Sequence, residues 1–202
     1  MEQRSSWPTT QSNLLLCIRD AKDHGAWERF VDLYAPVIFR YCRIQGLQEA
    51  DAQDVTQEVL SQISRSIGNF QYDPEKGKFR SWLGTVTWHR ICRHRRTRAR
   101  QVADARVGGE VLSEIPGKDD GAWVEVFNSH ILATALKNIR ARCSEEKWQA
   151  FHLLWVESLP PTDVAQQLDR RIEWVYKTKS RVLKELKREV EFLAADVGTL
   201  SN

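Results

Sequence analysis

Apolar residues recur three or four positions apart along most of the chain, the spacing that places side chains on one face of an α-helix. In the stretch 26–43, for example, Phe30, Leu33, Val37 and Tyr41 form one such stripe. Segments in which apolar and polar residues alternate between turn formers, as they do in strands, do not occur in this sequence. The pattern therefore predicts an all-α fold.

The same periodicity predicts where the helices of the first hundred residues lie. A helix over 49–67 would bury Val55, Val59 and Ile63, and it would end at Gly68 because glycine readily adopts the backbone conformation that stops a helix. Four helices are expected in this part. The first opens at Ser12 or Asn13, the second runs over 26–43, the third runs over 49–67, and the fourth begins at about Phe79.

Helical periodicity lapses over residues 101–121, where pairs such as Pro116-Gly117 favour turns. We interpret this segment as a flexible linker between a first domain over 1–100 and a second domain over 122–202. Fully extended, it would span on the order of 70 Å at roughly 3.3 to 3.6 Å per residue. The expected organisation is two small helical domains joined by a flexible linker.

The last part of the chain has the spacing of a helix-turn-helix unit. The short helix, the turn and the longer helix are expected over 162–168, 169–171 and 172–194. Val164, Ala165 and Leu168 would pack against Val175 and leave the start of the second helix free to enter a major groove. The pattern also fits an ordinary helical hairpin with a solvated basic face, although the excess of cations on the second helix favours DNA binding.

The formal net charge of +3 hides two basic blocks, over 89–100 and 170–188. The first block follows Trp82 and Trp88, and aromatic rings beside cations suit stacking on unpaired bases while the cations hold phosphates. The alternative is a solubilising helix end. Core packing is favoured for Trp82, whereas Trp88, flanked by polar residues, favours nucleic-acid contact.

Other classes of protein fit the sequence less well. The four cysteines are widely spaced without a C-x-x-C pair, which argues against disulfides or a cysteine zinc knuckle and favours a reducing cytoplasm. We expect no membrane span, signal peptide, cofactor or metal, and no catalysis by this chain alone. A metal-dependent helical nuclease built on the acidic helix is a rival, but it lacks a Glu-x-x-His pairing, and His89, Cys92 and His94 fit no zinc spacing.

Three runs in order, WERFVDLYAPVIFRYC, EADAQDVTQEVL and FQYDPEKGKFRSWLGTV, resemble region 2 of the extracytoplasmic-function (ECF) branch of the sigma-70 family of RNA polymerase sigma factors. PTDVAQQL and VYKTKSRVLKEL are similar to region 4 of the same family. The resemblance implies a sigma region 2 helical bundle and a sigma region 4 helix-turn-helix. The chain departs from the family at Trp88-His89, where Arg-Asn is frequent, and at Asp169-Arg170, where a glycine and an apolar residue are usual.

The resemblance also implies partners and site residues. The partners are core RNA polymerase, through its beta-prime clamp helices and beta flap, promoter DNA, and an anti-sigma factor of the kind that commonly holds ECF factors. The polymerase-binding residues are Asp51, Asp54, Gln57 and Glu58. The residues expected on the minus-10 element are Lys78, Arg80, Trp82, Thr85, Trp88, His89, Arg93, Arg95 and Arg96. Those expected on the minus-35 element are Arg171, Glu173, Trp174, Lys177, Thr178, Lys179 and Arg181.

These inferences lead to the hypothesis of a cytoplasmic, non-enzymatic sigma factor that docks on core polymerase, captures minus-10 bases and reads the minus-35 duplex. The main alternative is a free-standing helix-turn-helix regulator that binds palindromic DNA as a dimer. That regulator would bind tightly without polymerase, whereas a sigma factor requires it.

Overall fold

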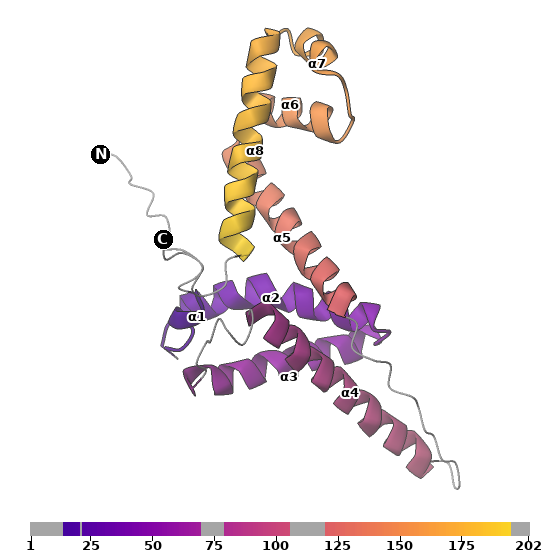
Figure 1. Cartoon of the computed structure of the whole chain (residues 1–202). Coiled ribbons are helices and arrows are strands. Elements are labelled where there is room, and N and C mark those ends of the chain that lie inside the picture. The colour runs from indigo at the N-terminus through magenta and orange to yellow at the C-terminus, as the bar shows by residue number, and fades with distance from the viewer. Residues whose placement is uncertain (1–13, 21, 70–78, 106–119, 195–202) are drawn as a thin grey trace. The chain divides into compact units, whose positions relative to one another are not determined.

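The computed structural model describes residues 14–20, 22–69, 79–105 and 120–194. Its helices, in chain order, are α1 (Leu14–Cys17), α2 (His24–Ile44), α3 (Glu49–Ser66), the short 3-10 helix η2 (Ile67–Asn69), α4 (Phe79–Ala105), α5 (Asp120–Arg142), α6 (Glu145–Trp155), α7 (Pro161–Gln167) and α8 (Ile172–Ala194) (Figure 1). The described residues contain no strand, which confirms the all-α prediction. The expected helix start at Ser12 or Asn13 lies outside them.

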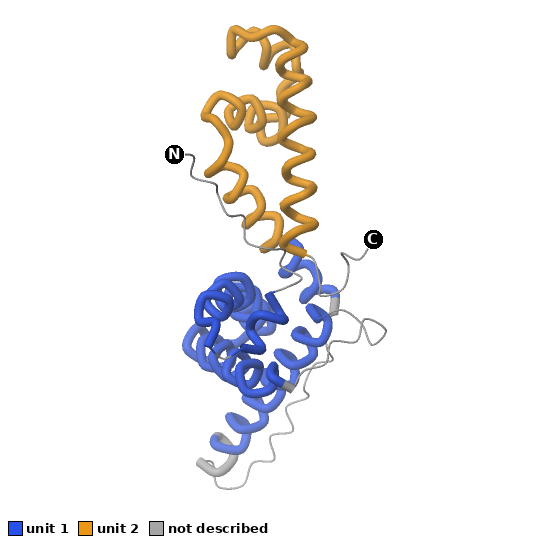
Figure 2. Tube along the Cα trace, turned by 90° about the vertical axis from the view of Figure 1, so that its left-hand side faces the viewer, with its two compact units in different colours: residues 1–128, 196–202 blue, residues 129–195 orange. Residues whose placement is uncertain are grey.

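The helices group into two compact units (Figure 2). Unit 1 contains the described residues up to Asn128, and unit 2 runs from Ser129 to the end of α8. The division falls inside α5, whereas the sequence suggested a second domain beginning at residue 122. None of the described helices is long and apolar enough to span a membrane.

In unit 1, α2 begins and ends at recognisable signals. The Asp23 side chain accepts a hydrogen bond of 2.9 Å from the Ala26 backbone N–H, which satisfies one of the donors left free at a helix start. Gly46 follows the helix with a φ of 86°, a conformation that glycine adopts without steric cost. The predicted stripe Phe30, Leu33, Val37 and Tyr41 is buried.

The core of unit 1 lies among α2, α3 and α4. Val55, Val59 and Ile63 of α3 are fully buried, as predicted, and so are Leu83 and Ile91 of α4. Burial of side chains of this size from three helices supplies the main stabilising term for such a bundle.

The segment expected to be a linker differs from the prediction at both ends. Helix α4 continues to Ala105, and α5 already begins at Asp120. Both helical ends that flank residues 106–119 belong to unit 1, because the first turns of α5 bury Trp123 and Phe127 there. Periodicity predicts that these residues are buried, but it does not tell which core they cover.

Unit 2 has a core of its own. Ala150, Leu153, Val164 and Val175 form one buried cluster, against which Ala165 and Leu168 pack. The predicted packing of the helix-turn-helix unit is therefore confirmed. A second cluster joins the later part of α5 to α6 and α8 through Ile139, Phe151 and Val182.

The turn between α7 and α8 is closed by a short backbone motif. Asp169 has a φ of 51°, the left-handed conformation that a glycine would adopt freely. The Arg170 backbone N–H donates to the Ala165 carbonyl at 2.9 Å, so a carbonyl at the end of α7 is satisfied. This geometry sets the start of α8 at Ile172.

Candidate nucleic-acid interface

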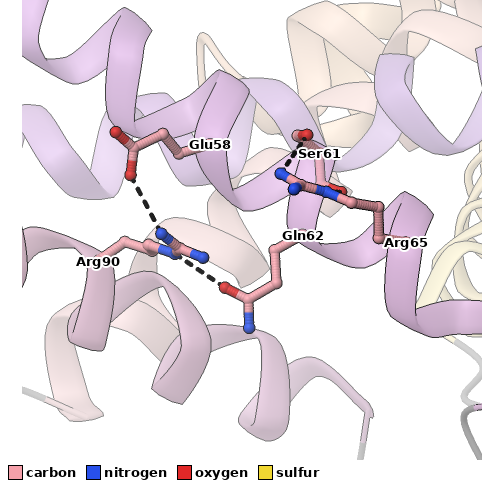
Figure 3. A network of polar contacts seen from close by, with 5 residues as sticks. All are labelled: Glu58, Ser61, Gln62, Arg65 and Arg90. Carbon is pink, nitrogen blue, oxygen red and sulfur yellow. Dashed lines mark hydrogen bonds and ion pairs between the residues drawn. The ribbon is translucent and has the colours of Figure 1, made fainter.

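The acidic side of α3 faces the arginine-rich helix α4. Arg90 lies between two α3 side chains: its Nε donates to Gln62 Oε1 at 2.8 Å, and its Nη1 lies 3.3 Å from Glu58 Oε2 (Figure 3). Nearby on α3, Arg65 donates to the Ser61 hydroxyl at 2.8 Å. The guanidinium of Arg90 thus ties α4 to α3 through one carboxylate and one amide.

A second group of contacts joins the same two helices further along. The Asp51 carboxylate forms an ion pair with Arg98 and lies 3.4 Å from His94 Nε2. Residues early in α3 therefore pair with residues late in α4, which shows that the two helices run antiparallel. The sequence analysis missed these pairs, although the acidic residues of one helix and the basic residues of the next were the signal for them.

The predicted polymerase-binding residues therefore differ in what they contact. Asp54, Gln57 and Glu58 are exposed, and Asp51 is partly buried. Asp51 and Glu58 form ion pairs with α4, whereas no ion pair of Asp54 is found among the described residues. Asp54 and Gln57 consequently offer the more accessible polar surface on this helix.

The arginines of α4 also differ in their exposure and contacts. Arg93, Arg96 and His89 are exposed. Arg95 is turned inward: it donates to the Gln45 carbonyl, and its guanidinium carbon lies 5.8 Å from the centre of the Trp88 ring. Exposed guanidinium groups such as those of Arg93 and Arg96 are suited to contacting phosphates.

The aromatic residues expected on the minus-10 element are more enclosed than the sequence suggested. Trp88 is buried, with 7% of its surface exposed, whereas its polar flanking residues suggested an exposed ring. Trp82 is half-buried and its ring lies 5.3 Å from that of Phe79, in line with the core packing favoured for it. The Thr85 hydroxyl donates to the Ser81 carbonyl at 3.1 Å. Lys78 lies outside the described residues.

Arg80, at the start of α4, contacts the first turns of α5. Its backbone carbonyl accepts the Trp123 indole N–H at 2.9 Å, and its guanidinium carbon lies 5.6 Å from the centre of the Phe127 ring. These contacts lie within unit 1 and were not predicted.

In unit 2, the residues expected on the minus-35 element line the start of α8. Arg171, Glu173, Lys177 and Arg181 are exposed. Thr178 is 4% exposed and packs on the core side, so this prediction does not fit the conformation described. The geometry of the turn otherwise leaves the first turns of α8 open to solvent, as a recognition helix requires.

Two of the cations near this surface lie over tryptophan rings. Lys179 Nζ is 4.9 Å from the centre of the Trp155 ring, and the Arg170 guanidinium carbon is 5.8 Å from that of Trp174. Arg170 also pairs with Glu146 of α6, and this carboxylate raises the pKa of the arginine. The arginine that replaces an apolar residue at this turn therefore gains an ionic contact with α6.

The described residues offer no metal site. Among them, no group of three or more His, Cys, Asp and Glu side chains lies close enough to hold an ion. Cys17, Cys42, Cys92 and Cys143 are free thiols. Burial raises the pKa of Cys42 to about 12 and also raises the pKa of Cys92 and Cys143.

Part of the first unit matches a known family. Residues 30–101 match the family model for sigma-70 region 2. This segment is a sigma-70 region 2 domain. The domain contains most of α2, the whole of α3 and most of α4, so the resemblance to the sigma-70 family is confirmed over the helices that carry the acidic side and the arginine block.

Two solved structures align with the chain that contains this region 2 domain. One is an RsbN-BldN complex, with 17% identity, a TM-score of 0.33, and coverage of 83% of this chain and 94% of that one. The other is CnrH in complex with the cytosolic domain of CnrY, with 15% identity, a TM-score of 0.37, and coverage of 90% and 97%. Both TM-scores are below the level at which a shared fold is inferred, so the assignment rests on the region 2 match.

Proposed function

We propose that the chain is an ECF-type sigma factor that binds core RNA polymerase in the cytoplasm and directs it to promoter DNA. The observation that carries the proposal is the region 2 match, on a domain whose α3 presents carboxylates and whose α4 presents exposed arginines. The separate helix-turn-helix unit, with exposed Arg171, Lys177 and Arg181, supports recognition of a second DNA element.

In this proposal α3 is the polymerase-binding helix. Asp54 and Gln57 are exposed, and their side chains are free to meet cations on the beta-prime clamp helices. Glu58, which is exposed, contributes after exchanging or sharing the Arg90 guanidinium, which costs little because ion pairs at a solvated surface contribute about 0 to 1 kcal/mol. Asp51 contributes through the part of its carboxylate that is exposed beside its ion pair with Arg98.

The two DNA contacts are proposed to differ in kind. Arg93 and Arg96 hold the phosphates of the minus-10 strand, while bases released from the duplex stack on aromatic side chains of the region 2 domain. Capture of such bases offsets an unstacking cost of a few kcal/mol per step. The start of α8 enters the major groove at the minus-35 element, where Arg171 and Lys177 reach base edges or phosphates.

Charge reversal on α3 tests the polymerase contact. Asp54→Arg should weaken binding to core polymerase by about tenfold or more, since truncating or reversing a central interface residue costs upward of about 1.4 kcal/mol. Asp32→Arg is the matched control, because Asp32 is exposed on α2 and undergoes the same change of charge. Binding would be measured by titrating labelled chain with core enzyme.

Specific transcription tests the function as a whole. Core polymerase with the wild-type chain should give a defined transcript from a promoter mapped by start-site sequencing, whereas core polymerase alone should not. The proposal fails if the chain neither binds core polymerase nor supports a specific transcript. Tight binding to palindromic DNA without polymerase would instead favour the dimeric regulator.

An anti-sigma factor remains a predicted partner of the proposed sigma factor. Co-purification of the full chain from its own cells, followed by reconstitution of transcription with and without the recovered protein, tests this prediction. A true anti-sigma factor would abolish the specific transcript and leave transcription by core polymerase with another sigma factor unchanged.

A further inference from the structure

The start of α5 is docked on the region 2 domain through a buried tryptophan. Trp123 is 3% exposed, and its ring stands edge-on to that of Tyr41, with ring centres 5.2 Å apart and an angle of 86° between the planes. Its indole N–H donates to the Arg80 carbonyl at 2.9 Å. Figure 1 shows the beginning of α5 beside α2. A tryptophan whose ring is buried and whose N–H is satisfied makes a specific anchor.

Phe127, four residues further on, extends the contact. It is 2% exposed, and its ring centre lies 6.3 Å from that of Tyr34 and 5.6 Å from the Arg80 guanidinium carbon. Val124, between the two anchors in sequence, is 52% exposed. Residues 120–128 thus form a short amphipathic helical segment of unit 1, which we call the docking segment, with one face packed against α2 and α4.

Gly84 of α4 makes room for this anchor. A Cβ atom added at Gly84 would lie 2.8 Å from Nε1 of Trp123 and 2.9 Å from two of its ring carbons, closer than side chains approach one another. The tryptophan ring therefore packs directly on the backbone of α4. An alanine at this position would force the ring away.

The docking segment lies on a face of α4 that the minus-10 contacts also need. Arg80, Gly84 and Trp88 are four residues apart and share one face of the helix. Arg80 and Gly84 contact Trp123, and Trp88 is 7% exposed. Stacking on an unpaired base requires an accessible aromatic ring. In the described conformation Trp123 therefore covers this face of α4 at Arg80 and Gly84, and the Trp88 ring further along it is not accessible to a base.

We propose that the docking segment is a reversible latch, which closes the minus-10 face of the free chain and leaves it when promoter DNA is engaged. This inference rests on the proposed function. Because DNA binds the open form, the apparent affinity for DNA is lowered by the fraction of chains that are open. A latch open in about one chain in ten lowers the affinity about tenfold.

The test compares latch variants of the full chain for binding to a single-stranded oligonucleotide carrying the non-template minus-10 sequence. Trp123→Ala and Gly84→Ala should each bind about tenfold more tightly than wild type, with and without core polymerase. Trp123→Phe, which keeps a ring and loses the indole N–H, should show a smaller gain. Val124→Ala is the matched control on the exposed side of the same segment and should leave the affinity unchanged.

Amide hydrogen exchange measures the opening of the latch independently of the affinity for DNA. In the free wild-type chain, amides of residues 124–128, beyond the first turn of α5, should be protected, and saturating oligonucleotide in the presence of core polymerase should release that protection. The two alanine variants should show fast exchange from the start, while circular dichroism checks that α2, α3 and α4 remain folded. Should Trp123→Ala fail to fold, Trp123→Phe still gives the graded comparison.

The outcomes separate the latch from the function. If the variants bind DNA no more tightly than wild type, or if residues 124–128 stay protected with DNA bound, the segment is a permanent part of the domain and the latch is wrong. If neither wild type nor any variant binds core polymerase or promoter DNA, the proposed function fails and the latch falls with it.

Discussion

At the scale of single residues, the environment of a side chain in the region 2 domain determines what it can do. Trp88 and Arg93 lie five residues apart on α4, yet one is buried and the other is exposed. The sequence predicted both as DNA contacts because it records residue type and spacing, whereas the approach of other helices decides exposure. Long-range contacts such as Arg80 with Trp123 are beyond what local periodicity reports.

Phe30 tests the aromatic centre of unit 1. Its side chain is fully buried, and its ring lies 4.6 Å from that of Tyr34 and 6.1 Å from that of Phe79. Phe30→Ala should lower the free energy of unfolding of unit 1 by about 3 to 5 kcal/mol, because it leaves a cavity among these rings. Ile44→Ala, at a residue 53% exposed, should change it by less than about 0.5 kcal/mol. Chemical denaturation read by hydrogen exchange in α2 and α3 makes the comparison, and equal effects would contradict it.

The thiol of Cys42 provides a pH-dependent test. Burial is the largest cause that raises its pKa from 9.0 to about 12, so the folded state keeps the proton that the unfolded state loses. The contribution of this thiol to stability is therefore fully present below pH 9 and is lost as the pH rises towards 12.

At pH 8 this protonated thiol should react with iodoacetamide far more slowly in the folded chain than in the unfolded chain, since the thiolate is the nucleophile. Cys17, which is partly exposed, serves as the internal control. Mass spectrometry of the alkylated chain gives both rates. Equal rates at the two cysteines would show that Cys42 is not enclosed as described.

At the scale of helices, the sequence predicted much of the fold. The start of α4 at Phe79 and both ends of α8 agree with the prediction, because each is marked by a strong change in periodicity or by turn residues. The α3–α4 pairs were not predicted, since Arg90 and Glu58 are far apart in sequence and their meeting depends on the antiparallel packing of two helices. The sequence therefore predicted which helices carry the candidate site, whereas the contacts between their side chains became known only from the structure.

Substitutions at Asp169 test how the turn between α7 and α8 contributes to the stability of unit 2. Asp169→Val should lower the free energy of unfolding of unit 2 by about 1 to 2 kcal/mol, because a branched side chain is strained in the left-handed conformation at φ 51°. Asp169→Gly should be close to neutral, since glycine adopts this conformation freely. Gln167→Val, at an exposed position in the last turn of α7, is the control. The idea is wrong if valine is tolerated equally at both sites.

At the scale of the whole molecule, exposed cations occur in both units. Arg93 and Arg96 belong to unit 1 and Lys177 to unit 2, and all three side chains are exposed. The division into two helical units follows the general expectation from the sequence. Its place inside α5 could not be foreseen, because an amphipathic helix can cover either of two cores with the same apolar stripe.

Salt dependence measures how many phosphates the cations of the proposed holoenzyme contact. Arg93→Ala and Arg96→Ala should each reduce the slope of log affinity against log salt by about 0.7 to 0.9, the value for one lost phosphate contact. Arg40→Ala, which removes an exposed arginine from α2, should leave the slope unchanged. Titrations of holoenzyme on a promoter fragment between about 50 and 200 mM salt would show this. Unchanged slopes for both α4 variants would remove these residues from the DNA contact.

The position of both flanks of residues 106–119 within unit 1 has a practical consequence. Lengthening a connection whose two ends are already held costs little, about 0.6 kcal/mol for each doubling of its length. A fluorescent reporter or an affinity tag inserted there should leave the packing of Trp123 within unit 1 intact. Such a tagged chain could follow promoter search in living cells.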